Sequence, residues 1–197
     1  MSNHKSNPKY KQITAKAHDL FWKFGIKRVT IEEVCSEAGV SKMTFYRFFP
    51  NKIELAKDVI SNIFDKTEKD YKALMSRDIP FEEKIKEQVR MKFEGTVNIS
   101  EAFVADVYSG WNDELKTFFN DITVRMVKLV RDDYVKAQQE GAIRKDVNID
   151  FIFYLSNKMT EMVSDPQLIA MYNNNVQSAI MEFMNMMFYG IVPRNDE

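Results

Sequence analysis

Apolar residues recur every three or four positions along most of this chain, and this periodicity constrains the fold more than any other feature. In the first such segment the apolar positions are Tyr10, Ile13, Ala17, Leu20, Phe21 and Phe24. This spacing places side chains on one face of an α-helix. Six glycines and five prolines are too few for the many turns of an all-β fold. The sequence therefore predicts an all-α protein.

The first 52 residues contain start and stop signals for several short helices. Gly25 ends the first helix, and Thr30 with Glu33 forms a capping box for a second one at 31–38. A break at Gly39 follows, and Ser41 caps a third helix at 42–48. Two capped helices separated by a glycine-containing turn form a helix-turn-helix unit. The sequence therefore predicts a three-helix head.

Longer helical segments follow this head. We expect helices at 52–75, 81–96, 100–110 and 112–140, another with an apolar stripe from Phe151 to Met162, and a last one from Pro166 to near Gly190. The predicted domains are a helix-turn-helix head at residues 1–52 and a larger helical effector-binding and dimerisation body at 53–197. The helix at 52–75 would connect them.

Charge is divided unevenly between these two parts. Residues 1–52 contain ten Lys or Arg and four Asp or Glu, a formal charge of +6, whereas the whole chain has −1. A basic head on an acidic body indicates that only the head meets a polyanion such as nucleic acid. The alternative is a chance distribution of surface charge.

The third helix carries the residues suited to reading DNA. At 3.6 residues per turn, one arc contains Lys42, Met43, Tyr46 and Arg47. Phe45 and Phe48 face the other way. A cationic and aromatic arc is what a helix entering the major groove requires, and Lys52 and Thr30 are placed to bind flanking phosphates. The alternative is an ordinary solvated helix face.

The stretch from Thr30 to Lys52 resembles the DNA-binding signature of the TetR family of bacterial transcriptional repressors. The matching residues are Thr30, Val34-Cys35, Ala38-Gly39-Val40-Ser41, Thr44-Phe45-Tyr46, Phe49 and Lys52. The resemblance implies double-stranded DNA as partner, with a palindromic operator and a homodimeric repressor, and it adds Ser41 and Thr44 to the DNA-binding residues. Met43 stands where the family often has Gly. Phe48 stands where His or Tyr is frequent, and it cannot donate a hydrogen bond to phosphate.

The C-terminal segment is apolar nearly all round. From Ala179 to Tyr189 only Glu182 and Asn185 are polar, so most sides of this helix must be covered. A subunit interface or a central core position would provide that cover. The resemblance favours the interface, because TetR-type dimers pair their last two helices. The predicted interface residues are Ile180, Met184, Met187 and Phe188.

Apolar residues on the mid-chain helices could line a pocket for a small hydrophobic or aromatic effector. These residues are Phe93, Phe103, Tyr108, Trp111, Phe118, Met126, Met159 and Met162. Met-rich walls adapt to varied ligands, but the same residues also fill ordinary cores.

Other classes of function find little support in the sequence. There is no phosphate-binding glycine loop, nucleophile motif or cluster of metal ligands, so we predict no catalytic residues, metal or cofactor and no enzyme. Cys35 is the single cysteine, and no apolar run approaches the length of about 18 residues that spans a bilayer, so we expect a cytoplasmic protein without membrane contact. A DNA-binding regulator without effector, or an activator, remains the alternative.

Overall fold

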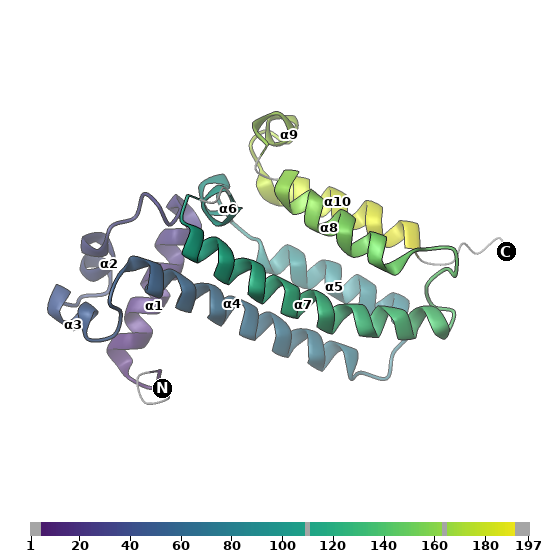
Figure 1. The fold of residues 1–197 in the computed structure, drawn as a ribbon, viewed down its shortest axis with the longest axis horizontal. Helices are drawn as coiled ribbons and strands as arrows, with labels where there is room; N and C mark the ends of the chain where they lie inside the picture. The colour runs from purple at the N-terminus through teal and green to yellow at the C-terminus, as the bar shows by residue number, and fades with distance from the viewer. Residues whose placement is uncertain (1–4, 109–110, 163–164, 192–197) are drawn as a thin grey trace. The chain divides into compact units, whose positions relative to one another are not determined.

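The computed structural model describes residues 5–108, 111–162 and 165–191, and in these ranges the chain is built from ten helices with no strand (Figure 1). The helices are α1 (Pro8–Phe24), α2 (Ile31–Glu37), α3 (Lys42–Tyr46), α4 (Lys52–Met75), α5 (Phe81–Gly95), α6 (Glu101–Tyr108), α7 (Asp113–Gln139), α8 (Ile149–Met162), α9 (Pro166–Met171) and α10 (Val176–Ile191). The predicted all-α class is confirmed.

The chain packs as two compact units. The first contains residues 1–65 and 98–120, and the second contains residues 66–97 and 121–197. Helices α4 and α7 contribute residues to both units. The first unit thus includes α6 and the start of α7 as well as α1 to α3. The functional boundary at residue 52 stays a prediction.

The core of the first unit holds α1 to α3 together with α6. Phe21 and Phe45 are fully buried there, and the phenol of Tyr10 donates a hydrogen bond to Asp58 of α4. The ring of Trp22 lies 4.9 Å from that of Phe103 in α6, measured between centroids. Side chains of α6 are therefore part of the scaffold that supports the head.

Gly25 allows α6 to approach the end of α1 closely. Its φ of 83° lies in the left-handed region, and a Cβ atom there would be 2.7 Å from Oδ2 of Asp106. That carboxylate accepts a hydrogen bond from the backbone N–H of Lys27 at 2.7 Å. Glycine is needed at this position for both the backbone angle and the space.

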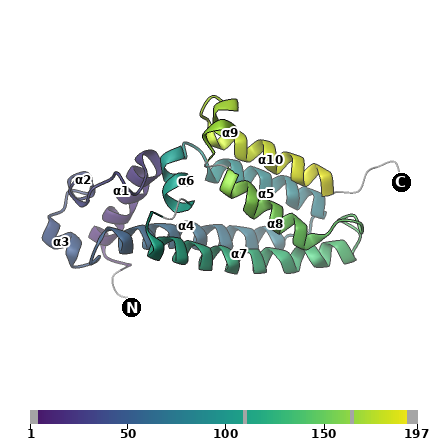
Figure 2. The same cartoon turned by 45° about the horizontal axis from the view of Figure 1, so that its top comes forward.

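The second unit has its own core, in which α5, α7, α8 and α10 meet (Figure 2). Ile85, Tyr134, Ile152 and Phe188 are buried together in it. Burial raises the pKa of the Tyr134 phenol well above its ordinary value. Tyr134 thus acts as a neutral core side chain with a polar tip.

The predicted capping signals are present. Thr30 and Glu33 form a reciprocal capping box at the start of α2, and Ser41 accepts a hydrogen bond from the N–H of Thr44 at the start of α3. Gly25 and Gly141 adopt positive φ directly after α1 and near the end of α7. Helix α3 ends at Tyr46, two residues earlier than predicted.

The prediction of one continuous last helix from Pro166 is wrong. The segment forms two helices, α9 and α10, separated by a turn in which Asn173 and Asn174 have φ of 53° and 60°. Asn175 then starts α10 by accepting a hydrogen bond from the N–H of Ser178 at 3.0 Å. Asparagine tolerates left-handed backbone better than most residues, so the run of three asparagines was the signal for this turn.

Within the described ranges, every helix is too short or too polar to cross a lipid bilayer.

Candidate nucleic-acid interface

Helices α2 and α3 are joined by a tight turn on a rigid apolar base. Val34 and Phe45 are fully buried, and Cys35 lies beside them with its thiol pKa raised by burial. Gly39 takes a φ of 61°, and the N–H of Val40 donates to the carbonyl of Cys35 at 3.0 Å. This geometry is the predicted helix-turn-helix, with the thiol as a packing group.

Helix α3 exposes the predicted reading arc. Met43 is 78% exposed and Tyr46 is 53% exposed, and Lys42 and Arg47 are also at the surface. Phe45 anchors the opposite side of the helix, and Phe48 packs partly buried against the same core. The exposed side chains therefore project from a short helix whose position is fixed by buried aromatic rings.

Lys42 forms an ion pair with Glu32 of α2. The hydrogen bond from Lys42 lowers the pKa of the Glu32 carboxyl, and the same contact raises the pKa of Lys42. Both side chains are more than half exposed, so the pair contributes little to stability and a phosphate or base can compete for the ammonium. Sequence spacing alone did not reveal this pair, because it depends on how α2 and α3 cross.

The three hydroxyls predicted to bind DNA all have partners within the head. Thr30 Oγ1 accepts from the N–H of Glu33 and donates to its carboxylate at 3.0 Å. Ser41 and Thr44 form a hydrogen bond between their hydroxyls at 3.0 Å. These groups lie at the starts of α2 and α3, where backbone N–H groups favour a phosphate. Their DNA contacts stay a prediction.

Lys52 has a structural role that the sequence did not predict. Its Nζ donates to the carbonyl oxygens of Lys27 at 2.9 Å and Val29 at 2.7 Å, in the loop that precedes α2. Partial burial lowers the pKa of this ammonium. Two of its three donors are therefore used inside the protein, which leaves at most one for phosphate.

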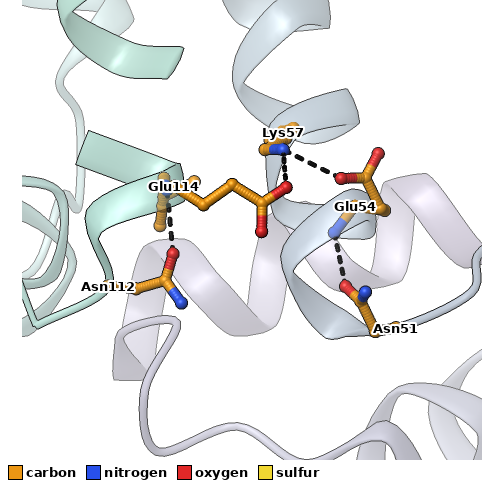
Figure 3. A network of polar contacts seen from close by, with 6 residues as sticks. Asn51, Glu54, Lys57, Asn112 and Glu114 are labelled. Atoms are coloured by element: carbon orange, nitrogen blue, oxygen red, sulfur yellow. Dashed lines mark hydrogen bonds and ion pairs between the residues drawn. The ribbon is translucent and has the colours of Figure 1, made fainter. Parts of the chain in front are cut away.

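A polar network fixes the starts of α4 and α7 next to each other (Figure 3). Asn51 accepts from the N–H of Glu54 at 2.9 Å, and Asn112 accepts from the N–H of Leu115 at 2.8 Å. Lys57 bridges the two helices by donating to Glu54 at 2.9 Å and to Glu114. The network thus holds the first turn of α4, which carries Lys52, in place under the head.

Comparison with known proteins agrees with this geometry. Residues 13–59 match the model of the bacterial regulatory proteins of the tetR family. The head of this chain is therefore similar to that family. A curated relative, the uncharacterized HTH-type transcriptional regulator YerO of Bacillus subtilis (strain 168), is 28% identical over 145 residues, which are 70% of this chain. The matched region spans 50% of that relative's own length.

Solved structures share the fold at low sequence identity. The regulatory protein TetR from Rhodobacter sphaeroides has a TM-score of 0.75 with 14% identity, covering 94% of this chain and 100% of its own. FadR from Bacillus subtilis, in complex with stearoyl-CoA, has a TM-score of 0.72 with 15% identity, covering 92% of this chain and 99% of its own. The likeness in fold therefore extends beyond the head.

The eight residues predicted to line an effector pocket are divided between the two units. Phe103 is buried in the first core, and Tyr108, Trp111 and Phe118 pack against it. In the second unit Phe93 and Met162 are exposed and Met126 is half-buried, while the side chain of Met159 lies outside the described residues. The structure does not gather these residues at one site within either unit, because half of them serve the core that supports the head.

The predicted dimer residues of α10 face mainly inward. Phe188 is buried against Ile85 and Ile152, so it is unavailable to a partner, and Ile180, Met184 and Met187 are partly buried. The outward positions of the same helix are Met186, 70% exposed, and Tyr189, 73% exposed. Sequence periodicity did not separate these faces, because both are apolar.

Proposed function

We propose that this protein is a DNA-binding transcriptional regulator of the TetR family that acts in the cytoplasm as a homodimer. It represses transcription from a palindromic operator and leaves the DNA when a small hydrophobic effector binds. The observation that carries the proposal is the exposed arc of α3, supported from behind by the buried ring of Phe45. Lysine and arginine recognise guanine edges, and an apolar side chain such as Met43 fits a thymine methyl group.

The outward faces of α8 and α10 support the assignment of a second copy as partner. Phe151 and Tyr154 of α8 are exposed with their ring centroids 6.5 Å apart, and Met186 and Tyr189 of α10 are exposed as well. A recess of about 380 Å³ is lined by Phe151, Leu155 and Met187 among others, whereas Tyr189 borders a second recess together with residues of α5. Large exposed apolar side chains on these two helices favour a protein interface. A twofold dimer presents two identical recognition helices, so its operator is a near-palindrome.

Two further points support an effector. The second unit has its own apolar core apart from the head, and one structural neighbour, Bacillus subtilis FadR, was solved with stearoyl-CoA. A TetR-type regulator without effector, or an activator, would share the same head. Only the response of the DNA complex to added compounds and the effect on transcription distinguish these three.

The test begins with selection of bound sequences from a random DNA pool, followed by footprinting. We expect a near-palindrome protected by a dimer. Tyr46→Ala, which removes a largely exposed ring and hydroxyl, should reduce the affinity for it by more than any other single change on α3. Lys128→Ala, on α7, is a matched surface control that leaves the affinity unchanged. Protection of a single asymmetric site by a monomer, or an undiminished affinity of the Tyr46 variant, contradicts the proposal.

A further inference from the structure

Glu32 is the acidic side chain of α2 that extends to α3. Its neighbour Glu33 is occupied at the start of α2, where its carboxylate accepts hydrogen bonds from the N–H and the hydroxyl of Thr30. Glu32 instead forms an ion pair with Lys42, the first residue of α3. The side chains of Lys42 and Glu32 are 57% and 60% exposed. The pair therefore presents a cation and an anion side by side on the surface of the head.

This ion pair lies at the start of the arc that is proposed to enter the major groove. Lys42 and Met43 are consecutive residues of α3, and Met43 is 78% exposed. The ring of Phe45 is fully buried on the opposite side of the helix, which fixes the face that α3 turns outward. Because the charged ends of Lys42 and Glu32 are in contact, a base pair that bonds to one of them lies within reach of the other. DNA phosphates would repel a lone carboxylate, but Lys42 neutralises this one.

Both groups keep hydrogen-bonding capacity beyond the ion pair. The hydrogen bond from Lys42 lowers the pKa of the Glu32 carboxyl, so Glu32 is ionised at neutral pH and acts only as an acceptor. An ammonium has three donors, and an ionised carboxylate has about four acceptor sites. One contact between them therefore leaves donors on Lys42 and acceptor sites on Glu32 for a third partner. That partner must offer acceptors and a donor next to each other.

The major-groove edge of a G·C base pair has this pattern. Guanine offers N7 and O6 as acceptors, and cytosine offers an N4–H donor. O6 and N4 share a Watson–Crick hydrogen bond and lie about 2.9 Å apart, which matches the spacing of about 2.7–2.9 Å between a hydrogen-bonded ammonium and carboxylate. In an A·T pair the N6 amine lies between the two acceptors, so an ammonium can reach only one of them.

We propose that Glu32 and Lys42 together read one G·C base pair in each half-site of the operator. Lys42 donates to N7 and O6 of the guanine, and Glu32 accepts from N4 of the cytosine. Glu32 is thus a residue that determines specificity, although it lies on α2 and outside the arc of α3. This role rests on the proposed function, because it requires a head that binds DNA.

Selection from a random DNA pool, carried out with the unaltered protein and with Glu32→Ala, locates the base pair. The unaltered protein should select one fixed G·C pair in each half-site. Glu32→Ala should discriminate against other base pairs at that position about fivefold to tenfold less, because one base contact is lost. Its affinity for unrelated DNA should be equal or higher, since a negative charge is removed. Glu37→Ala, at an exposed position of the same helix, removes the same charge and should leave the preference unchanged.

N4-methylcytosine at the located position tests the contact with a single atom. The methyl group replaces the N4–H that faces the major groove and leaves the Watson–Crick hydrogen bond in place. Methylation should weaken operator binding by the unaltered protein and by Glu37→Ala about fivefold or more. It should leave binding by Glu32→Ala unchanged, because that variant has no contact to lose.

Three outcomes overturn the proposal. Unchanged discrimination in Glu32→Ala would mean that the ion pair only ties α2 to α3. A uniform gain in affinity for all sequences would mean that Glu32 only weakens the attraction of Lys42 to phosphate. Equal effects of cytosine methylation on the unaltered protein and on Glu32→Ala would exclude the contact with N4.

The exposed position of the ion pair makes a folded variant the expected result. Glu32→Ala should melt close to the temperature of the unaltered protein, because exposed ion pairs contribute little to stability. If it does not fold, Glu32→Gln must lose the preference for G·C at the same position, since glutamine pairs best with adenine. A Glu32→Gln protein that keeps this preference refutes the reading role.

The same selection distinguishes this inference from the proposed function. An unaltered protein that enriches no sequence refutes the DNA-binding regulator, and with it the reading role. A palindrome selected with the same preferences by the unaltered protein and by Glu32→Ala supports the regulator and refutes only the reading role of Glu32.

Discussion

Replacing Lys52 by methionine should destabilise the head even when no DNA is present. Methionine keeps most of the apolar stem but removes the ammonium that donates to the carbonyls of Lys27 and Val29. A hydrogen bond from a charged group contributes about 1.5–3 kcal/mol when buried. The ammonium is only partly buried and water can replace it at the carbonyls, so we expect a total loss of about 2–3 kcal/mol for the two bonds together.

Urea unfolding followed by circular dichroism at 222 nm measures this loss. Lys42→Met is the matched control, since its ion pair with Glu32 is exposed and should contribute at most about 1 kcal/mol. Lys52→Met should also bind all DNA sequences more weakly, because the loop before α2 is no longer held. Two results together would refute the structural role: an unchanged urea midpoint, and a salt dependence of DNA binding that is flatter by about one counterion per half-site. They would show that Lys52 acts by contacting a DNA phosphate.

Three further predictions concern other parts of the chain. Met43→Ala should relax the preference at one base pair by about 1 kcal/mol or less, measured with single-base operator variants, whereas a uniform loss at every operator would contradict a reading role. Tyr189→Lys, on the exposed face of α10, should dissociate dimers in sedimentation velocity while helicity is retained. Phe188→Lys, on the buried face, should instead unfold the second unit. Dimers that survive Tyr189→Lys would exclude the exposed face of α10 as the interface. Burial and the nearby Asp133 raise the pKa of Tyr71 above its ordinary value of about 10. The stabilising contribution of the neutral Tyr71 phenol is therefore complete below about pH 10 and is lost as the pH rises further. Above about pH 10 the urea midpoint should fall less steeply in Tyr71→Phe than in the unaltered protein, and identical profiles would contradict this.

The parts of this fold that the sequence predicted are governed by local interactions. The capping box of Thr30 and Glu33 and the cap at Ser41 each involve residues three apart in the chain, so the pattern itself contains the contact. Gly25 ends α1 for an equally local reason. The turn at Asn173 and Asn174 was just as local, and it was missed because asparagine is a weaker signal for left-handed backbone than glycine.

The parts that the sequence could not predict depend on contacts between distant residues. Lys52 reaches carbonyls 23 and 25 positions away, and no spacing rule distinguishes that use of an ammonium from a phosphate contact. The same holds for Phe103, which belongs to the core of the first unit because α6 packs on Trp22. Apolar character places such a residue inside the protein, but not in a particular core.

Helix α10 illustrates how exposure resolves an ambiguity that composition leaves open. An apolar helix can be a central core element or can be covered by a partner, and the sequence fits both. A central position would bury every face, yet Met186 and Tyr189 are largely exposed in the described chain, while Phe188 between them is buried. The exposed face also contains Glu182 and Asn185, one to two turns before Tyr189, so only its C-terminal part is apolar. A partner that covers α10 must therefore bury Met186 and Tyr189 and leave the polar end in water, which predicts a limited contact centred on the end of this helix.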